Sequence, residues 1–542
     1  MQSQQIVNDA LEALTLVAER AMPRILSQVC RDSGSPFFGC ADRNWWHYKM
    51  RDFPSVILQQ SGATLYAAQT LSSLSQYKGS LHSIVEGSCL FWNKRATKFR
   101  AFEEYYPWEE GYPPLAFSTL SVVRMAAESV VSVNDIRPGL QVASQQLLNR
   151  FEAQAANQQV AGLAALCWTH VITPDLVSLD DVSVLTEKTL KLQSNEGWFQ
   201  EYGGPDLGYL SVTIDCLWDA FDATGDARLL QSAEKALDFL EKMTRNTNGE
   251  SIGMHNARNT DYIVPYGIAR FLNSSASIES QKKSLRVLNY IFTKSSHLKH
   301  FFSSIDDRYW CHYIGLSVSR SVQYLSSIDL EDLVQFQDQE TDVERYFPHS
   351  GYIWSNIGDS KNTILISMKK GGNFTIFSNI ENCSDFGWVV QSSNKEYVSH
   401  WWSNNWQVQK TKKGCIIAGS LFSHVEIQST PLHHLLLRLA SLFMGRRVIG
   451  LLKQKFIFKK QKNVVDFKRE IFIQRKSIKV VDKFNNLPAD CTLKRAPRSS
   501  KRHVASADSF HYEDLSLGGC LIREVKEHSS DRAEIVTTYS VG

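Results

Sequence analysis

The stretch from Gly197 to Tyr266 decides the fold: it opens with GWFQEYGGPDLGYLSVTIDCLWDAFDATGD (197–226) and closes with GMHNARNTDYIVPYG (253–267). Apolar residues at three and four spacing predict amphipathic helices over 208–224 and 228–245. Glycine turns separate these helices, and aromatic, amide, imidazole and carboxylate side chains gather at the turns. Such a rim of stacking and hydrogen-bonding groups predicts a surface that holds a sugar.

The same helical periodicity recurs up to about residue 327, between glycine or proline turns such as 203–205. The other expected helices cover residues 5–30, 55–75, 115–130, 142–170, 262–273, 281–298 and 312–326. Repeated helical hairpins without a short strict sequence repeat favour a closed double ring of helices over an elongated solenoid. Residues 1–327 are therefore predicted to form an (α/α) toroid that holds the catalytic site.

The pattern changes after this region. An acidic segment with weak apolar periodicity, 328–344, is the expected linker. Short β-branched runs between Gly, Asn, Ser and Lys clusters then predict strands, at 362–368, 374–377, 387–390 and 477–482. Residues 345–542 are expected to form an antiparallel β-sandwich, interrupted by one helix near 431–443. The predicted fold class is α+β, with two domains.

Composition and charge limit the possible functions. The 542 residues, 43% hydrophobic and 21% charged, are typical of a soluble globular protein too long for one domain. The formal net charge of +3 gives no argument for nucleic-acid binding. Residues 1–26 read as an amphipathic helix, so no signal peptide or membrane span is expected and a cytoplasmic location is predicted. Ten scattered cysteines predict reduced structural thiols.

Six motifs, taken in order and spacing, resemble one known family. They are AANQQVAGLAAL around Asn157, PDLGYL around Tyr209, HNARNTDY (255–262), RYFPHSGYIWSN (345–356), KKGGNFTIFSN (369–379) and SDFGW (384–388). Over most of its length the chain resembles the heparinase II/III-like polysaccharide lyases and the related alginate lyases. The resemblance implies an (α/α) toroid with a C-terminal β-sandwich, and cleavage of a uronic-acid-containing glycan by β-elimination.

In that family an Asn lies on one toroid helix and a catalytic Tyr begins a later helix; here Tyr209 follows Asn157 by 52 positions. β-Elimination removes the C5 proton beside a uronate carboxylate, which hydrogen-bond donors must first neutralise. Asn157, Gln158 and Arg258 are the expected donors. Tyr209 is expected to protonate the departing glycosidic oxygen, and to act as base where a cation lowers its pKa. The structural alternative is a helix-start residue with its ring in the core.

Two loop residues have competing interpretations. His255 is expected to act as base or to neutralise the carboxylate, and a loop histidine that bonds the backbone is an equal alternative. Asn259 could pair with a substrate carboxylate or sulfate beside Arg258, or fasten the loop to Asp261. The other substrate-binding residues expected on this rim are Trp198, Glu201 and Tyr262.

Aromatic and basic residues near the N-terminus are expected to form a wall of the cleft by stacking on pyranose rings and pairing with acidic groups. They are Trp45, Trp46, His47, Tyr48 and Arg51, within DRNWWHYKMRDFPS (42–55). The alternative for this segment is a helix cap with a tryptophan anchor. A second aromatic and acidic segment, EEYYPWEEGYPP (103–114), is expected to lie over the same mouth of the ring.

The chain departs from the family pattern at two positions. Gln158 stands where the family has His, and an amide does not carry a proton at neutral pH. The sandwich histidine of many relatives is also missing from Asn382–Asp385. His349 and His400 are the expected substitutes in substrate binding.

Two other functions stay open. A glycoside hydrolase on the same toroid would need two carboxylates across a cleft, and the candidates are Glu201, Asp206 and Asp261, with Glu109 and Glu110 in reserve. A catalytically silent glycan-binding or assembly protein would keep the cleft without the proton chemistry.

The expected partner is an acidic polysaccharide or oligosaccharide. The setting suggested by the resemblance and the missing leader is bacterial capsule, exopolysaccharide or O-antigen metabolism. No cofactor and no metal site are expected. Some relatives hold a structural divalent cation in the sandwich, and the sequence identifies no ligands for one. Neither the sugar nor the oligomeric state follows from the sequence.

Overall fold

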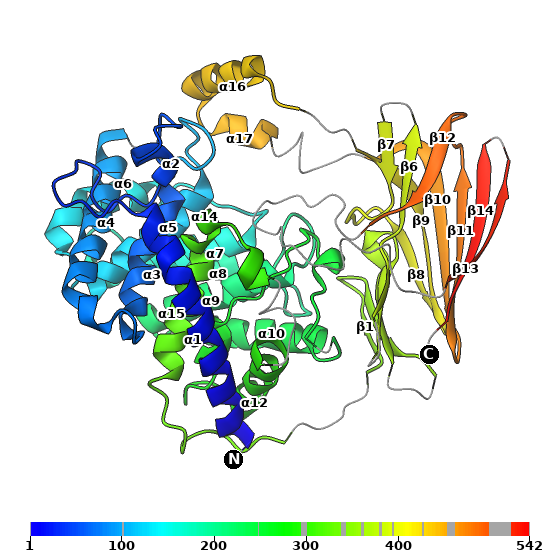
Figure 1. The fold of residues 1–542 in the computed structure, drawn as a ribbon, viewed down its shortest axis with the longest axis horizontal. Helices are drawn as coiled ribbons and strands as arrows, with labels where there is room; N and C mark the ends of the chain where they lie inside the picture. The colour runs from blue at the N-terminus through cyan, green and yellow to red at the C-terminus, as the bar shows by residue number, and fades with distance from the viewer. Residues whose placement is uncertain are drawn as a thin grey trace.

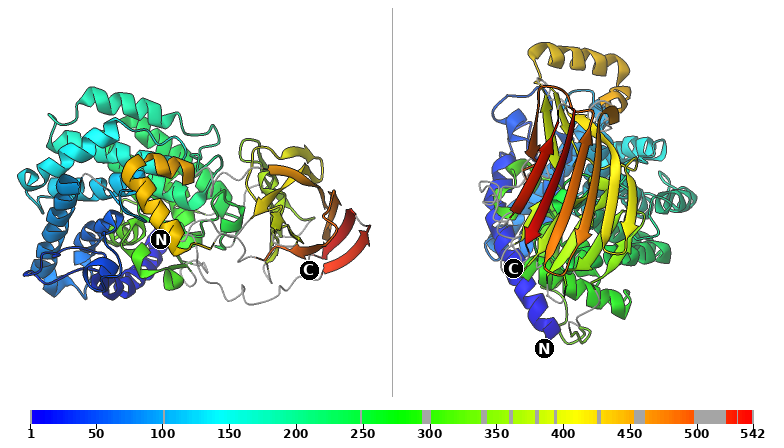
Figure 2. Two further views of the ribbon diagram at one scale, coloured as in Figure 1. Left: turned by 90° about the horizontal axis from the view of Figure 1, so that it is seen from above. Right: turned by 90° about the vertical axis from the view of Figure 1, so that its right-hand side faces the viewer.

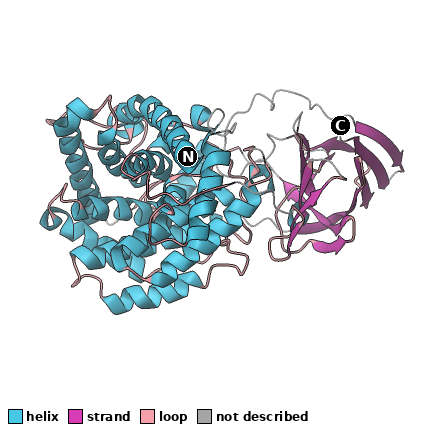
Figure 3. Ribbon diagram, turned by 90° about the horizontal axis from the view of Figure 1, so that it is seen from below, coloured by secondary structure: helices cyan, strands magenta, loops and turns pink. Residues whose placement is uncertain are grey.

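A computed structural model shows a helical domain joined to a domain of two sheets (Figure 1). It describes residues 2–540 except 100–101, 248, 294–300, 338–342, 359–361, 379–381, 393–394, 425–427, 453–460, 498–521 and 530. The described helices are confined to one side of the molecule and the strands to the other (Figure 3), apart from two helices that leave the sheet domain.

The helical domain holds the helices up to Leu325. Their bounds are α1 (Gln2–Gln28), α2 (Arg43–Trp46), α3 (Ser61–Ala67), α4 (Lys78–Phe99), α5 (Tyr112–Ala127), α6 (Val133–Leu148), α7 (Ala156–Ile172), α8 (Leu179–Leu190), α9 (Leu207–Thr224), α10 (Ala227–Thr244), α11 (Tyr266–Arg270), α12 (Ile278–Val287), α14 (Asp307–Trp310) and α15 (Tyr313–Leu325).

Helices α5, α7 and α9 form an inner layer, because nearly all of their residues are buried. Helices α6, α8 and α10 lie outside them and are amphipathic, so one face of each is exposed. The ring closes because α15, near the end of the domain, packs against α1 and α3. The predicted toroid is therefore confirmed.

Local signals set where the inner helices begin. The carboxylate of Asp206 caps α9 by accepting a hydrogen bond from the backbone N–H of Tyr209 at 3.1 Å, and Gly225 ends the helix with φ of 67°. Pro113 and Pro114 lie in the first turn of α5. The helix expected over 142–170 is two helices, since α6 ends at Leu148 and α7 begins at Ala156. This break places Asn157 in the first turn of α7.

The sheet domain begins with Arg345 and ends with the last described strand. The bounds are β1 (Arg345–Phe347), β2 (Tyr352–Asn356), β3 (Thr363–Ser367), β4 (Asn373–Phe377), β5 (Cys383–Asp385), β6 (Trp388–Ser392), β7 (Lys395–Val398), β8 (Gln407–Thr411), β9 (Gly414–His424), β10 (Gln461–Ile473), β11 (Ser477–Asn485), β12 (Cys491–Arg495), β13 (Ile522–His528) and β14 (Arg532–Ser540).

Among the described residues these strands form two antiparallel sheets. The smaller follows chain order, β1-β2-β3-β4-β5, and the larger runs β12-β6-β7-β9-β10-β11-β14-β13, with β8 paired to β9. Side chains of the smaller sheet, including Tyr352, Trp354 and Leu365, belong to the apolar core of the helical domain. A separate core lies between the sheets. The predicted antiparallel sandwich is confirmed, and its smaller sheet faces the toroid.

A buried ion cluster joins the two sheets. Arg469 on β10 is fully buried and binds the carboxylates of Asp482, at 2.7 and 2.9 Å, and Asp385, at 3.3 Å. Arg495 and the hydroxyl of Tyr539 also donate to Asp385. These cations are the reason that the pKa of Asp385 falls to about 2, although burial alone would raise it.

Two helices leave the sheet domain between β9 and β10 and lie over the helical domain (Figures 1 and 2): α16 (Pro431–Met444) and α17 (Arg447–Leu452). An ion pair of 2.5 Å between Arg438 on α16 and Asp52 joins them to it. The predicted helix near 431–443 is thus confirmed, but as an excursion from the sandwich.

The expected linker, 328–344, lies between α15 and β1, and its residues 338–342 are outside the described part of the chain. Eight described cysteines are free. Cys383 on β5 is disulfide-bonded, so the prediction of reduced thiols is wrong there. Pairing depends on which strands lie together, which spacing along the chain does not reveal. No helix among the described residues has the length and apolar character needed to cross a bilayer.

Candidate functional site

A cavity of about 650 Å³ in the helical domain is the candidate site, and its volume is within the roughly 300–1,000 Å³ usual for ligand pockets. Its described lining consists of Ile57, Glu104, Tyr105, Tyr106, Glu109, Gly111, Tyr112, Pro113, Phe117, Arg150, Glu152, Gln154, Asn157, Gln158, Tyr202, Tyr209, Arg258, Tyr309, His312, Tyr313, Arg446, Ile449, Gly450 and Leu452. The lining combines aromatic rings, amides and charged groups, a mixture suited to sugar binding.

The first turns of four helices meet at this cavity. Tyr112 begins α5, Asn157 and Gln158 lie in the first turn of α7, Tyr209 in that of α9, and Tyr313 begins α15. The N-terminal end of a helix carries positive partial charge. Four such ends directed at one cavity favour an anionic group such as a carboxylate.

The amide side chains of α7 have unused acceptors. Oδ1 of Asn157 and Oε1 of Gln158 are buried without a hydrogen-bond partner among the described residues. The backbone N–H of Asn157 donates to Oε1 of Glu201 at 2.8 Å. Burial raises the pKa of Glu201 well above its usual value, which favours a neutral carboxylic acid. Glu201 therefore supports the start of α7 from behind and does not line the cavity.

Tyr209 is partly exposed to the cavity, with its ring packed edge-on against Tyr262 at 6.1 Å. Burial, followed by Tyr313, raises the pKa of Tyr209 well above 10, so its hydroxyl stays protonated at neutral pH. This state suits a proton donor. The buried hydroxyl of Tyr262 bonds that of Tyr313 at 2.9 Å and so ties α15 to the segment before α11.

Arg258 reaches the cavity from the loop after α10. Its backbone N–H donates to Asp206 at 3.1 Å, and its guanidinium lies 4.6 Å from the ring centre of Tyr202. Nε of Arg258 is buried and has no partner among the described residues. Gly208 lets the loop that contains Arg258 and Thr260 pack closely on α9, because a Cβ at position 208 would lie 2.3 Å from Oγ1 of Thr260.

His312, the residue before α15, is a site residue that sequence analysis missed. It lines the cavity, and its buried Nε2 has no partner among the described residues. Burial, followed by the charge of Arg308, lowers its pKa well below 6.5, so the ring is neutral at neutral pH. Its segment, DRYWCHYIG (307–315), is as rich in aromatic and imidazole groups as 253–267, and that similarity could have revealed it.

The segment 103–114 supplies one wall of the cavity, including the carboxylates Glu104 and Glu109. Oε2 of Glu109 accepts backbone N–H bonds from Glu104 at 2.9 Å and Tyr105 at 2.7 Å. Burial, with the neighbouring Glu104 second, raises the pKa of Glu109 to about 7. Asp206 instead caps α9 and binds Thr260, and Asp261 accepts from Ser251 at 2.6 Å, outside the cavity lining.

His255 lies outside the cavity lining, between the toroid and the sandwich. Both ring nitrogens are occupied, Nδ1 by Ser367 and Nε2 by Thr375, each at 2.9 Å. Burial lowers its pKa to about 3. The structure therefore places His255 as an interface residue. Asn259 has a similar position, because its Oδ1 accepts a hydrogen bond from Lys370 of the sandwich.

The remaining predicted substrate-binding residues also lie outside the described cavity lining. Trp45 packs on Phe37 and Phe91, and Trp46 donates to the carbonyl of Gln28, with His47 and Tyr48 beside it. Arg51 supports the cavity wall indirectly, by donating to the carbonyl of Glu104 at 2.8 Å. This segment thus corresponds to the tryptophan-anchor alternative.

Trp198 donates to Glu196, which also accepts the backbone N–H of His349, so both residues belong to the contact between domains. The side chain of His349 is exposed, and that of His400 is buried in the sheet domain. No group of three or more His, Cys, Asp or Glu residues in the described part of the chain is arranged to hold a metal ion.

No protein-family model matches this chain, and no curated protein is similar to it in sequence. Solved structures are similar in fold. Chondroitin AC lyase of Streptomyces coelicolor A3, determined with chondroitin sulphate, is 8% identical with a TM-score of 0.52; the match covers 98% of this chain and 77% of that one. Xanthan lyase of Paenibacillus is 11% identical with a TM-score of 0.53; the match covers 99% of this chain and 56% of that one.

Heparinase III is 10% identical with a TM-score of 0.47, over 97% of this chain and 84% of that one. The chain thus spans just over half of the xanthan lyase and about three quarters of the chondroitin lyase. The first two similarities confirm the fold that the sequence motifs implied, the toroid and sandwich of polysaccharide lyases. At 8–11% identity they show the fold alone.

Proposed function

We propose that this protein is a polysaccharide lyase that cleaves a uronic-acid-containing glycan by β-elimination. One observation carries the proposal. A single cavity, at which four helix N-termini meet, is lined by Tyr209, Asn157, Gln158, Arg258 and a neutral histidine, His312. Several of these groups have buried polar atoms without a partner among the described residues, and a glycan has hydroxyl donors for the amide oxygens and a carboxylate for Arg258.

Carboxylate neutralisation is the first requirement. The N–H groups of the Asn157 and Gln158 amides and of the Arg258 guanidinium are donors for the uronate carboxylate, and the helix ends add positive potential. Neutralising this carboxylate lowers the cost of forming a carbanion at C5.

Proton transfer then divides between two residues. Nε2 of His312 accepts the C5 proton, the C–H electron pair forms the C4–C5 double bond, and the C4–O4 bond breaks. The hydroxyl of Tyr209 donates its proton to O4 of the leaving sugar, and solvent afterwards restores both residues. The pKa shifts fit these roles, because His312 is neutral and Tyr209 protonated before reaction. A bound carboxylate raises the low pKa of His312 and strengthens it as base.

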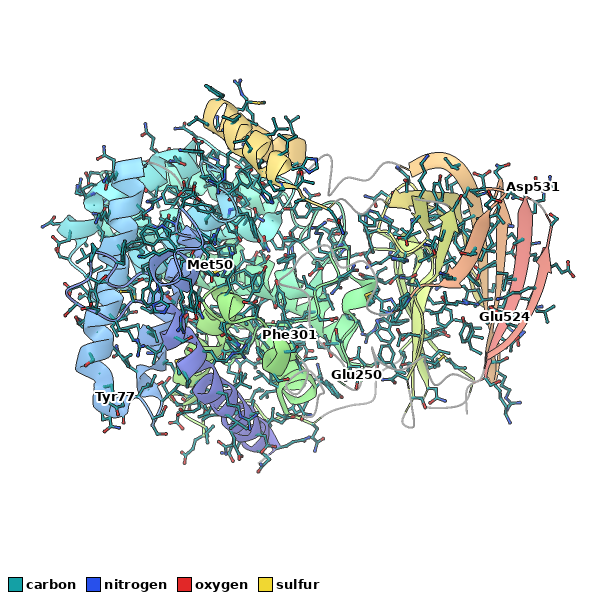
Figure 4. All side chains as sticks on the ribbon, turned by 45° about the horizontal axis from the view of Figure 1, so that its top comes forward. Met50, Tyr77, Glu250, Phe301, Glu524 and Asp531 are labelled. Carbon is teal, nitrogen blue, oxygen red and sulfur yellow. The ribbon has the colours of Figure 1, made fainter. Side chains whose placement is uncertain are left out.

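The substrate class in this proposal is an acidic polysaccharide or oligosaccharide, with bacterial capsule, exopolysaccharide or O-antigen metabolism as its setting. The test is incubation of the full chain with a panel of uronate glycans, followed by ultraviolet absorbance of the unsaturated product. Tyr209→Phe should abolish the signal. The matched control is Tyr77→Phe, because Tyr77 is 52% exposed at the end of the helical domain away from the sandwich (Figure 4).

A hydrolase is the second candidate, and one observation favours it: Glu109 lines the cavity with a pKa of about 7. A carboxylic acid with that pKa can protonate a glycosidic oxygen at neutral pH. Hydrolysis would release reducing ends without the ultraviolet chromophore, and Glu109→Gln would stop it. A silent glycan-binding protein would give neither product while binding glycan equally well with Phe at position 209.

A further inference from the structure

The exposed face of α16 is a second surface that the proposed reaction does not use. Six large apolar side chains on this helix are between 45% and 83% exposed: Leu432, Leu435, Leu436, Leu439, Leu442 and Phe443. Their spacing of three and four positions places them in one stripe along the helix. The opposite side faces the toroid, since Ser441 is buried and Arg438 pairs with Asp52.

An exposed apolar stripe of this kind indicates a surface that binds a partner. Apolar patches on soluble proteins are usually small and scattered, and a continuous one marks an interaction surface. Helix α16 stands at the edge of the molecule, above the helical domain and away from the core of the sandwich (Figure 2). A capping box at Thr430 and Pro431 in the first turn fix where this helix begins.

The charge around the stripe identifies the partner. From Ile427 to Val465 the sequence has no Asp or Glu and eight basic residues: Arg438, Arg446, Arg447, Lys453, Lys455, Lys459, Lys460 and Lys462. Arg438 pairs with Asp52, and Arg446 and Arg447 are described and exposed directly after α16. This local excess stands out in a chain whose net charge is only +3. An amphipathic helix with a leucine-rich face and basic flanks matches the chemistry of an anionic lipid surface.

We propose that α16 docks this protein on an anionic membrane surface, with its leucine stripe in the interfacial layer and the exposed Arg446 and Arg447 near lipid phosphates. A second copy of the chain is a poorer occupant. A second copy would present the same surface, which has no Asp or Glu between residues 427 and 465 to pair with the basic residues.

Docking through α16 places the cavity near the membrane. Arg446, Ile449 and Leu452, which directly follow α16, line the cavity. The mouth that they border therefore lies close to the lipid surface when α16 is bound. A glycan held at the membrane is then within reach of the cavity, whichever reaction takes place there.

The test is flotation of the full chain with vesicles of phosphatidylcholine alone and of phosphatidylcholine mixed with phosphatidylglycerol. We expect binding to the mixed vesicles only, and binding about ten-fold or more weaker for the Leu435→Glu/Leu439→Glu variant. Salt of about 1 M should also release the protein, since the Debye length falls to about 3 Å. The matched control is Leu179→Glu/Val184→Glu on α8, where the side chains are 60% and 69% exposed.

Failure to bind mixed vesicles, or equal binding by the α16 variant, overturns the proposal. Equal binding to both vesicle types overturns its electrostatic part. A dimer that the α16 variant dissociates, without vesicle binding, assigns the stripe to a second copy. Thermal unfolding of each variant confirms that the exposed substitutions leave the fold intact. None of these outcomes depends on glycan cleavage.

Discussion

The toroid cavity and the ion cluster of the sandwich are both buried and polar, but their hydrogen bonding is opposite. In the cluster, Arg469 directs its guanidinium at Asp385, Asp482 and the carbonyl of Gly372. In the cavity, Asn157, Gln158, Arg258 and His312 each have a buried polar atom without a partner among the described residues.

This difference separates polar groups that stabilise the fold from those that we assign to a ligand. A buried donor or acceptor without a partner costs about 1–3 kcal/mol of stability, so several together destabilise the toroid. The sandwich carries no such cost at Arg469, whose charge is compensated by two carboxylates. Substitution should therefore affect activity at the cavity and stability at the cluster.

Tyr209→Phe is the most direct test of whether a cavity residue affects activity and not stability. Loss of the acid should reduce elimination by about 10²–10⁴-fold, because general acid catalysis contributes this much. The free energy of unfolding should change by less than about 1 kcal/mol, since the ring stays in place. Initial rates of chromophore formation and urea denaturation measure the two effects. A large loss of stability together with activity would make Tyr209 a structural residue.

Asp385→Ala should have the opposite profile. Removing one partner of a buried ion cluster leaves uncompensated charge and costs about 3–5 kcal/mol of stability. Urea denaturation of the sandwich measures the loss. Asp466→Ala is the control, because this carboxylate on β10, the strand of Arg469, is exposed and its loss should cost at most about 1 kcal/mol. Equal effects would show that the cluster contributes no more than a surface pair.

His312→Gln tests the base. We expect about 10²-fold slower elimination with glycan binding retained, since only proton abstraction is lost. The pKa of His312 lies well below 6.5, so the activity of the wild type should fall on the acid side of that value, as the ring protonates. The variant should lack this acid limb. An unchanged pH profile would assign the base to another group.

For His255 we expect the smallest effect in the window tested, a change in the pH dependence of stability between about pH 6 and 5. Its pKa is about 3 in the folded protein, so between about 6.5 and 3 only the unfolded chain binds its proton. Its contribution is complete above about 6.5 and declines as pH falls, by about 1.4 kcal/mol per unit. His255→Gln should flatten the stability curve between about pH 6 and 5. A catalytic His255 would instead change the rate at neutral pH.

Much of the site was predictable from the sequence because it depends on local signals. Asp206, three residues before Tyr209, starts α9 and so places the tyrosine in its first turn. The same holds for the helix near 431–443, which Thr430 caps. The start of α7 was not predicted, because no side chain caps it and the expected helix ran from 142 to 170. The resemblance to polysaccharide lyases rested on these motifs, and the solved structures confirm the fold.

Other positions could not be predicted from the sequence. His255 and His312 both lie in connections between longer helices, and nothing local distinguishes the one held by Ser367 and Thr375 from the one that faces the cavity. Likewise, PLHHLLLRLASLF describes an apolar helix but not which of its faces is covered.

Caps, glycines and apolar spacing act between neighbours along the chain, so the alternation of a helical and a strand region and the start of α9 followed from the sequence. Tertiary contacts alone set which helix ends share the cavity, which histidine has both nitrogens hydrogen-bonded and which leucines are exposed. These outcomes depend on closure of the ring and on the contact of the sandwich with it, which join residues more than a hundred positions apart.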